Sequence, residues 1–519
     1  MKYPIGIQSF EEIRTKGFVY VDKTALVYRM VTEGKVYFLS RPRRFGKSLL
    51  LSTLKAYFQG KRVLFEGLAM EGLEADWAVH PVFHVDFANK NFNRPEELEE
   101  AIESFIAAAE HEYGKDEFAT TVGDRFASVL AKAKARYGQG AVVLVDEYDK
   151  PLLDVLGTPQ EERNRNVLKA FYSTFKSADD HLRFVMLTGV TKFSQISVFS
   201  GFNQPRDISM VERYDTLCGI TEKELHQTFA TSIRSMARKK KQTVKQTKEE
   251  LRAHYDGYHF SSQLKGVYNP FSVLSALDNQ EIGDYWFATG TPTYLIRLME
   301  HFDENMCDML SRYYPASEFV DYRADVQRPL PMLYQSGYLT IKDFNPHVRT
   351  YRLDFPNHEV TTGFVTLVAN QYLKPSEGTE SWITRVAEAL RLGQLEALRQ
   401  ELTAFFAGIP YHLRRKQGLE EQERDFQYTF FLIIKMVSAY RTVVEKAQSQ
   451  GRVDCVVETP DYIYLFEFKR DGTAQAALQQ IRDMGYAREY ASDSRRLYAI
   501  GCNFSTRTGT IDDWAVEEP

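Results

Sequence analysis

Apolar residues in the first 190 positions gather into short runs, and each run is followed by a stretch with helical periodicity. A short apolar run is typical of a strand that is buried on both faces, as in parallel sheets. Strands that alternate with helices in this way predict a parallel α/β sheet over residues 36–190. The expected strands cover residues 36–39, 81–87, 141–145 and 182–189, and the expected helices cover 46–57, 95–113, 121–137 and 161–178.

The pattern changes to helices from residue 221 and changes again near residue 375. Two strand-like runs within 329–353 predict that these helices belong to a small winged-helix-like lid. A polar segment at 375–379 and a basic one at 414–418 mark further seams. Beyond them we expect a helix at 423–440, two alternating strands at 451–457 and 462–469, and a helix that carries Gln479 and Gln480.

Length and composition favour a globular protein of several domains. The chain has 519 residues, 44% hydrophobic and 26% charged, so about three cores are expected. No stretch approaches the ~20 apolar residues of a membrane span, and the first residues contain no apolar signal core. The four cysteines form no C-x-x-C pair, which fits a cytoplasmic protein without a zinc site. The net charge of −5 means that any nucleic-acid contact would depend on a local groove.

A phosphate-binding loop is predicted between the first strand and its helix. Gly46-Lys47-Ser48 opens the helix, as in G-x-x-x-x-G-K-[ST], although Arg41 stands where the first glycine belongs. The bare triplet would occur by chance about 0.2 times in such a chain, so an ordinary turn with a surface lysine is the alternative. The residues expected to contact ATP here are Arg41, Arg43, Arg44, Phe45, Gly46, Lys47, Ser48 and Leu49.

The strand at 141–145 is followed at once by Asp146 and Glu147. We expect Asp146 to join Ser48 around Mg²⁺, and Glu147 to orient or deprotonate the attacking water. The next strand ends in Thr188, which we expect beside the γ-phosphate as a sensor of hydrolysis, with Lys192 as second choice. A hydroxyl that only bonds backbone is the alternative for Thr188.

Two further segments are candidates for contacts with the base. Pro292 ends a rigid turn after an aromatic cluster and is expected to pack on adenine, with core packing as the alternative. Asp22, Lys23 and Thr24 end a strand-like run and are expected either near the base or, for Thr24, as a helix cap. The basic run at 238–241 is read as a solvated helix face, with nucleic-acid contact as the minority alternative.

The two strands near the C-terminus carry a second set of candidate residues. Side chains alternate along a strand, so Glu467 and Lys469 share one face while Phe466 and Phe468 share the other. If the two strands pair as a hairpin, Asp454 stands beside Glu467, and the two carboxylates can hold one Mg²⁺ for phosphodiester hydrolysis. An exposed hairpin with an ordinary Glu/Lys pair is the alternative.

The segments 41–48, 145–149, 451–454 and 467–469 together resemble bacterial AAA-ATPase-like proteins with a C-terminal PD-(D/E)XK nuclease-type domain. In that family an Arg-Pro-Arg-Arg-Phe run also replaces the first loop glycine. The resemblance implies Mg-ATP at Lys47, Ser48 and Asp146, with Glu147 catalytic. In the nuclease domain it implies Asp454 and Glu467 as metal ligands and catalytic residues together with Lys469 and Gln480, helped by Glu423. Val453 stands where the motif's name has proline.

The expected domains are a P-loop AAA-ATPase-like domain (1–220), a helical, winged-helix-like lid (221–375), a helical linker (376–414) and an α/β restriction-endonuclease-like domain (415–519). The main hypothesis is an ATPase coupled to a metal-dependent nuclease that acts on nucleic acid, with DNA favoured over RNA and the choice between them left open. However, residues 411–519 contain 15 Lys and Arg against 17 Asp and Glu, a net charge of −2. A nucleotide-dependent switch with an inactive nuclease fold is therefore the second hypothesis, and assembly as a homo-oligomer is left open.

Overall fold

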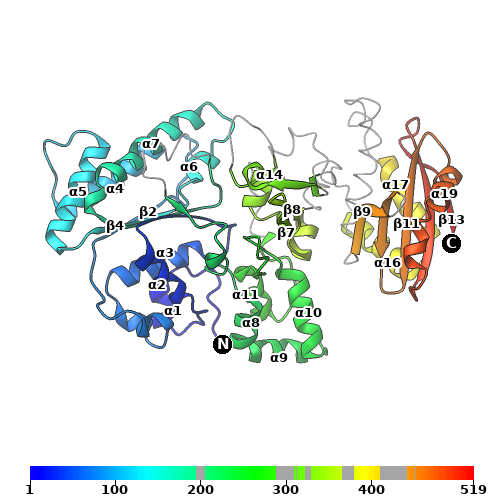
Figure 1. Ribbon diagram of the computed structural model, residues 1–519, viewed down its shortest axis with the longest axis horizontal. Helices are drawn as coiled ribbons and strands as arrows, with labels where there is room; N and C mark the ends of the chain where they lie inside the picture. Colours follow the sequence, from blue (N-terminus) through cyan, green and yellow to red (C-terminus); the bar gives the residue numbers. More distant parts are fainter. Residues whose placement is uncertain are drawn as a thin grey trace. The chain divides into compact units, whose positions relative to one another are not determined.

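The computed structural model describes residues 1–193, 205–287, 309–310, 312–321, 329–364, 379–408, 441–448 and 451–519. The chain divides into two compact units (Figure 1). Unit 1 comprises Met1–Asp303 and Ser311–Glu359, and unit 2 comprises Glu304–Leu310 and Val360–Pro519. Each unit is described separately.

A five-stranded parallel sheet lies at the centre of unit 1, in the order β2-β3-β4-β1-β5. Its strands are β1 (Val36–Ser40), β2 (Val82–Asp86), β3 (Ala141–Asp146), β4 (Leu182–Gly189) and β5 (Arg206–Asp207). All six residues of β3 are buried, as expected for a strand covered on both faces. The predicted parallel α/β sheet is confirmed, and β4 lies between the two strands that carry the candidate motifs.

Helices lie on both sides of this sheet (Figure 1). The helix α3 packs on β2, β3 and β4, whereas α4, α5 and α7 pack on one another and α5 contacts β3. Thr121 caps α5 by accepting a hydrogen bond from the N–H of Asp124, which is why the helix begins there. The helices are α1 (Phe10–Thr15), α2 (Thr24–Glu33), α3 (Lys47–Phe58), α4 (Glu97–Tyr113), α5 (Val122–Tyr137), α6 (Lys150–Leu153) and α7 (Gln160–Ser177).

The segment before α2 differs from the prediction. Residues 18–23 form no strand, and Thr24 is the first residue of α2 instead of its cap. The carboxylate of Asp22 accepts hydrogen bonds from both the N–H and the hydroxyl of Thr24 (2.8 and 2.7 Å). The Asp22 side chain thus forms a local hydrogen-bonded turn at the start of α2.

The rest of unit 1 consists of a helical cluster and a small antiparallel sheet. The cluster contains α8 (Glu222–Thr228), α9 (Ala230–Lys239), α10 (Val244–Tyr255) and α11 (Pro270–Asn279). Its core includes Leu225, Phe229 and Ile233, and the N-terminal residues Tyr3 and Val19 pack against that core. The small sheet has the order β6-β8-β7, formed by β6 (Tyr313–Pro315), β7 (Thr340–Asn345) and β8 (Thr350–Asp354), next in sequence to α14 (Pro329–Gln335).

Unit 2 is built on a five-stranded mixed sheet in the order β13-β12-β11-β10-β9. Only β11 and β12 run parallel, and β10 and β11 form the expected hairpin. Phe466 and Phe468 face a core shared with α16 and α17, whereas Leu465 faces α19, so the strand alternates as predicted. The elements are α16 (Thr379–Leu392), α17 (Leu395–Gly408), β9 (Arg441–Gln448), β10 (Gly451–Glu458), β11 (Tyr462–Arg470), α19 (Ala474–Asp483), β12 (Arg496–Ser505) and β13 (Thr510–Glu517).

The helices α16 and α17 contribute to the core of the C-terminal sheet. Trp382 and Leu390 lie in one buried cluster with Phe466, and the hydroxyl of Tyr464 donates to the carbonyl of Leu390 (2.6 Å). The four domain limits expected from the sequence stay predictions. Glu423, Pro292, the helix at 423–440 and the seam at 414–418 lie outside the described residues. Among the helices described, none is long and apolar enough to cross a membrane.

Candidate functional site

The loop between β1 and α3 bends through two residues in left-handed conformation. Arg44 has φ 66° and Gly46 has φ 91°, whereas Arg41 has no positive φ. Left-handed backbone favours glycine, so the loop requires glycine at position 46 but not at position 41. The missing first glycine therefore leaves no backbone strain at Arg41.

The first turn of α3 is open toward the loop. No side chain caps this helix, and a Cβ atom built on Gly46 would meet nothing within 4 Å. The N–H groups at an uncapped helix start, next to a backbone that alternates its handedness, form a concave site for an anion. Ser48 and Leu49 lie in this first turn, and their contact with phosphate stays a prediction.

Lys47 points back into the loop. Its ammonium group donates to the carbonyls of Arg41 (2.9 Å) and Pro42 (3.0 Å), and only 6% of the residue is exposed. Burial lowers the pKa of Lys47, while the carboxylates of Glu147 and Asp146 oppose this shift. These interactions place the ammonium group near Asp146 and Glu147 at the end of β3. Phosphate oxygens could replace the carbonyls of Arg41 and Pro42 as its acceptors.

The three arginines of the loop differ in their surroundings. Arg41 is buried, and its guanidinium donates to the carbonyls of Ser40 and Ser209 (2.9 and 2.7 Å). Arg43 and Arg44 are exposed, and the guanidinium carbon of Arg44 lies 5.1 Å from the ring centroid of Phe271. Contacts of these arginines with phosphate stay a prediction.

Asp146 and Thr188 meet at the ends of β3 and β4. The hydroxyl of Thr188 donates to Oδ1 of Asp146 at 2.7 Å, and both residues are buried. The same carboxylate oxygen accepts the N–H of Glu147 (3.1 Å), which has φ 48°. A non-glycine residue with positive φ is strained, and such strain is concentrated at functional sites. The sensor candidate thus touches the metal-ligand candidate directly.

Asp149 is a buried acid that sequence reasoning did not assign. Its carboxylate accepts the N–H groups of Val190 (3.0 Å) and Thr191 (2.5 Å), just beyond the end of β4. Burial raises the pKa of Asp149 to about 6, and the charge of Glu147 adds to the shift. The only sequence signal was that Asp149 closes the acidic segment 145–149.

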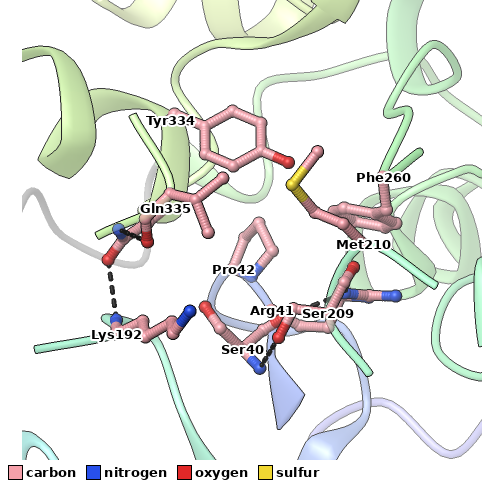
Figure 2. Close-up of a pocket in the computed structure, with 10 residues that line it drawn as sticks. Ser40, Arg41, Pro42, Lys192, Ser209, Met210, Phe260, Tyr334 and Gln335 are labelled. Atoms are coloured by element: carbon pink, nitrogen blue, oxygen red, sulfur yellow. Dashed lines mark hydrogen bonds between the residues drawn. The ribbon is translucent and has the colours of Figure 1, made fainter. Parts of the chain in front are cut away.

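Lys192, the second sensor candidate, lies in the pocket of Figure 2. Its ammonium group forms ion pairs with Asp207 (3.0 Å) and Asp321 (2.8 Å). Burial lowers the pKa of Lys192, but the two ion pairs outweigh it and the pKa is raised. Its N–H donates to the side-chain oxygen of Gln335 (2.8 Å). Lys192 therefore connects the end of β4 to the segment around α14.

A larger, mostly apolar pocket opens beside the phosphate-binding loop. It contains about 660 Å³ of space between atoms, part of it open to solvent. Its lining includes Gly46 and Leu49 of the loop region, and Val21, Leu217, Cys218 and Pro270 from distant segments. Lys23 also lines it and forms a 2.7 Å ion pair with Glu224. Apolar pockets of a few hundred Å³ with few polar groups are typical of small-molecule sites.

The candidate residues of unit 2 converge on the hairpin of β10 and β11. The last pair in the ladder is Cys455 with Phe466, so Asp454 and Glu467 are opposite each other one step further. An oxygen of Glu467 accepts the N–H of Asp454 (3.4 Å), and Asp454 accepts the N–H of Phe468 (2.8 Å). Burial raises the pKa of Glu467, and the charge of Asp454 raises it further.

Lys469 and Gln480 complete this cluster. The ammonium group of Lys469 lies 3.9 Å from Glu467 and donates to the side-chain oxygen of Gln480 (2.5 Å). Within the described ranges no group of three or more His, Cys, Asp or Glu side chains could hold a metal. Two carboxylates nevertheless fit Mg²⁺, which usually keeps several water ligands and binds through one or two carboxylates plus phosphate.

Comparison with known proteins assigns both units to families. Residues 4–199 match the family described as "Predicted AAA-ATPase", and residues 421–514 match the "PD-(D/E)XK nuclease superfamily". The chain is also 35% identical over 532 residues to an "Uncharacterized protein in vnfD 5'region" of Azotobacter chroococcum mcd 1, with 99% of each chain covered. The chain therefore belongs to the family of AAA-ATPase-like proteins that carry a C-terminal PD-(D/E)XK nuclease-superfamily domain.

Proposed function

We propose that unit 1 binds and hydrolyses Mg-ATP. The observation that carries this proposal is the meeting of three groups at adjacent strand ends. Lys47 lies within the field of Asp146, and Asp146 accepts the hydroxyl of Thr188. Lys47 and the N–H groups of α3 bind the phosphates, Ser48 and Asp146 hold Mg²⁺, and Glu147 orients the attacking water. Mg²⁺, when bound, neutralises charge on the phosphate oxygens.

The apolar pocket beside the loop is the proposed site of the base. It adjoins Gly46, and its Val21, Leu217 and Pro270 side chains offer apolar contacts for a purine ring. The helical cluster, whose helix α11 begins at Pro270, then acts as a lid over the nucleotide.

Calorimetric titration of the full-length protein with Mg-ATP tests this part. Lys47→Ala should weaken binding by about 100-fold or more, because it removes a charge-assisted phosphate contact. Lys169→Ala, which changes an exposed lysine on α7, should bind as the wild type does. Equal affinity of the Lys47 variant and the wild type, or no binding by the wild type, would refute the ATP site.

We further propose that unit 2 is a metal-dependent phosphodiesterase domain that acts on nucleic acid, DNA in preference to RNA. Asp454 and Glu467 hold Mg²⁺, while Lys469, oriented by Gln480, stabilises negative charge that develops on the phosphate. Cleavage of duplex and single-stranded DNA and RNA with Mg²⁺ or Mn²⁺, with and without ATP, tests this. Glu467→Gln should abolish cleavage, whereas Asp461→Asn, in the exposed turn between the two strands, should not.

A second candidate function is a nucleotide-dependent switch in which unit 2 binds a partner without cutting. The net charge of −2 over residues 411–519 favours it, because a domain that grips a duplex usually concentrates positive charge. In that case Lys47→Ala would abolish nucleotide-dependent partner binding, and Lys469→Ala would change nothing. Loss of function in the Lys469 variant alone would exclude the switch.

A further inference from the structure

Arg41 connects the start of the phosphate-binding loop to segments that come 168 and 173 residues later. One terminal nitrogen donates to the carbonyls of Ser40 (2.9 Å) and Ser209 (2.7 Å), and the other donates to the carbonyl of Tyr214 (3.3 Å). The guanidinium carbon lies 3.9 Å from the ring centroid of Phe260. Figure 2 shows the Arg41 side chain extending beside Ser209 and Phe260.

Such a position is costly for a cation. Only 1% of Arg41 is exposed, and removal of a charge from water must be compensated by local partners. Here the partners are main-chain carbonyls, an aromatic face, and the field of Asp215 and Asp207. A phosphate contact through the terminal nitrogens would require them to leave these carbonyls. The placement therefore indicates that the Arg41 side chain holds the start of the loop against these distant segments.

Neighbouring loop residues are held by the same part of unit 1. A Cβ atom on Gly337 would lie 2.6 Å from Cβ of Pro42, so the two residues are packed without a gap. The ring of Phe45 packs edge-on against Tyr258 and Phe260, with centroids 4.7 and 5.7 Å apart. The loop is thus fixed by tertiary contacts on either side of Arg43 and Arg44.

The peptide between Arg43 and Arg44 is fixed as well. The indole N–H of Trp286 donates to the carbonyl of Arg43 (3.2 Å). In a trans peptide the N–H points opposite to the C=O, so this bond directs the N–H of Arg44 away from Trp286. Arg44 and Gly46 are left-handed residues, and successive N–H groups in a backbone of alternating handedness can converge on an anion.

We propose that Arg41 is a positioning residue, which fixes the phosphate-binding loop in its nucleotide-binding shape from outside the loop, with Trp286 as its helper. An ordinary loop obtains this shape from its glycines, whereas this loop obtains it from Ser209, Tyr214 and Phe260 through Arg41. The inference depends on the proposed ATP site. Its distinctive consequence is that restoring the consensus glycine, Arg41→Gly, weakens nucleotide binding.

The test compares ligands with and without phosphates on the full-length protein. Mg-ADP and adenosine are titrated by calorimetry against wild type, Arg41→Gly, Arg41→Lys and Trp286→Phe. Arg41→Gly should lose about tenfold or more in Mg-ADP affinity, and adenosine affinity should stay within about twofold. Arg41→Lys should recover part of the loss, because it keeps the charge and one set of donors. Trp286→Phe, which removes the indole N–H together with part of the ring that packs on Tyr338, should lose about threefold for Mg-ADP alone.

Trp77→Phe is the matched control, since Trp77 packs on Tyr57 and Phe65 away from the loop, and its affinities should equal those of the wild type. Unchanged or tighter Mg-ADP binding by Arg41→Gly would overturn the inference while leaving the ATP site intact. Equal losses for Mg-ADP and adenosine would also overturn it, because they indicate general damage to the fold. If the Arg41 variants do not fold, Trp286→Phe decides: a loss of Mg-ADP affinity without a loss of adenosine affinity supports the inference, and unchanged Mg-ADP affinity overturns it. A wild type that binds neither ligand would refute the proposed ATP site itself.

Discussion

Replacement of Asp149 by Asn isolates the cost of a buried charge beside the candidate sensor. Asp149 is 1% exposed, and burial raises its pKa from 3.8 to about 6. Because the pKa in the folded state is the higher one, the folded protein binds more protons than the unfolded chain between about pH 4 and 6. The contribution of Asp149 to stability therefore falls as the pH rises through this window.

The size of the effect follows from the shift. A shift of about two pKa units corresponds to roughly 3 kcal/mol of lost stability once both states are ionised. About 1.4 kcal/mol of this loss falls between pH 5 and 7.5. Asparagine carries no charge, so its own effect on the hydrogen bonds to Val190 and Thr191 is independent of pH. The stability of Asp149→Asn relative to wild type should thus rise by about 1.4 kcal/mol from pH 5 to 7.5.

Urea unfolding of the full-length protein measures this difference. In a background with Trp382→Phe and Trp514→Phe, the remaining tryptophans of the sequence, Trp77 and Trp286, report on unit 1. Asp180→Asn, at an exposed position of the same unit, should show no such pH dependence. A difference for Asp149→Asn that stays constant or falls with rising pH would refute the reasoning.

Three further predictions concern the ends of β4 and β11. Thr188→Val should lower kcat for ATP by about tenfold or more with nearly unchanged Kd, because the hydroxyl bonded to the carboxylate of Asp146 is lost. In a phosphate-release assay Thr188→Ser should remain active, whereas a fully active Thr188→Val would contradict the sensor role. Gly189→Ala should destabilise unit 1 by about 2 kcal/mol in urea unfolding, because its Cβ would lie 2.5 Å from a carboxylate oxygen of Asp149. Gly72→Ala, with open space around it, should be neutral. Equal stabilities of the two variants would refute the clash. Chelation of the metal with EDTA should stop cleavage by unit 2. In calorimetry Glu467→Gln should abolish the binding of Mn²⁺ to that unit. Undiminished Mn²⁺ binding by this variant would place the metal elsewhere.

The parts of the fold that follow from local pattern were predictable. The strand at 141–146 is apolar along its whole length and is followed by two acids, so its burial and the exit of Asp146 at the sheet edge could be anticipated. The alternation in 462–470 likewise predicted that Glu467 and Lys469 share a face. The strand-like run before Thr24 forms no strand, because an apolar pattern does not supply a partner strand, and the N–H of Val19 donates to the carbonyl of Lys2 instead.

Partners that lie far apart in the sequence were not predictable. Asp149 bonds the backbone of residues 190–191, Lys23 pairs with Glu224, and Gln335 holds the N–H of Lys192. The sequence next to each of these side chains contains no signal for its partner, because the partner is a main-chain group or a residue from another element. Periodicity carries information about the face on which a residue lies, and none about which distant segment packs against that face.

Sequence alone determined the alternation of strands and helices over residues 36–190, the positions of Gly46, Lys47 and Asp146 in it, and the family of the chain, since these depend on short-range pattern and motif spacing. Only the tertiary structure decided the role of Arg41. In sequence it is a missing glycine and a candidate phosphate ligand. In the fold its guanidinium is buried against carbonyls 168 and 173 residues away, and the loop needs no glycine at that position because its backbone there is not left-handed. Long-range packing, which fixes where a flexible side chain ends, is the property that a linear pattern does not contain.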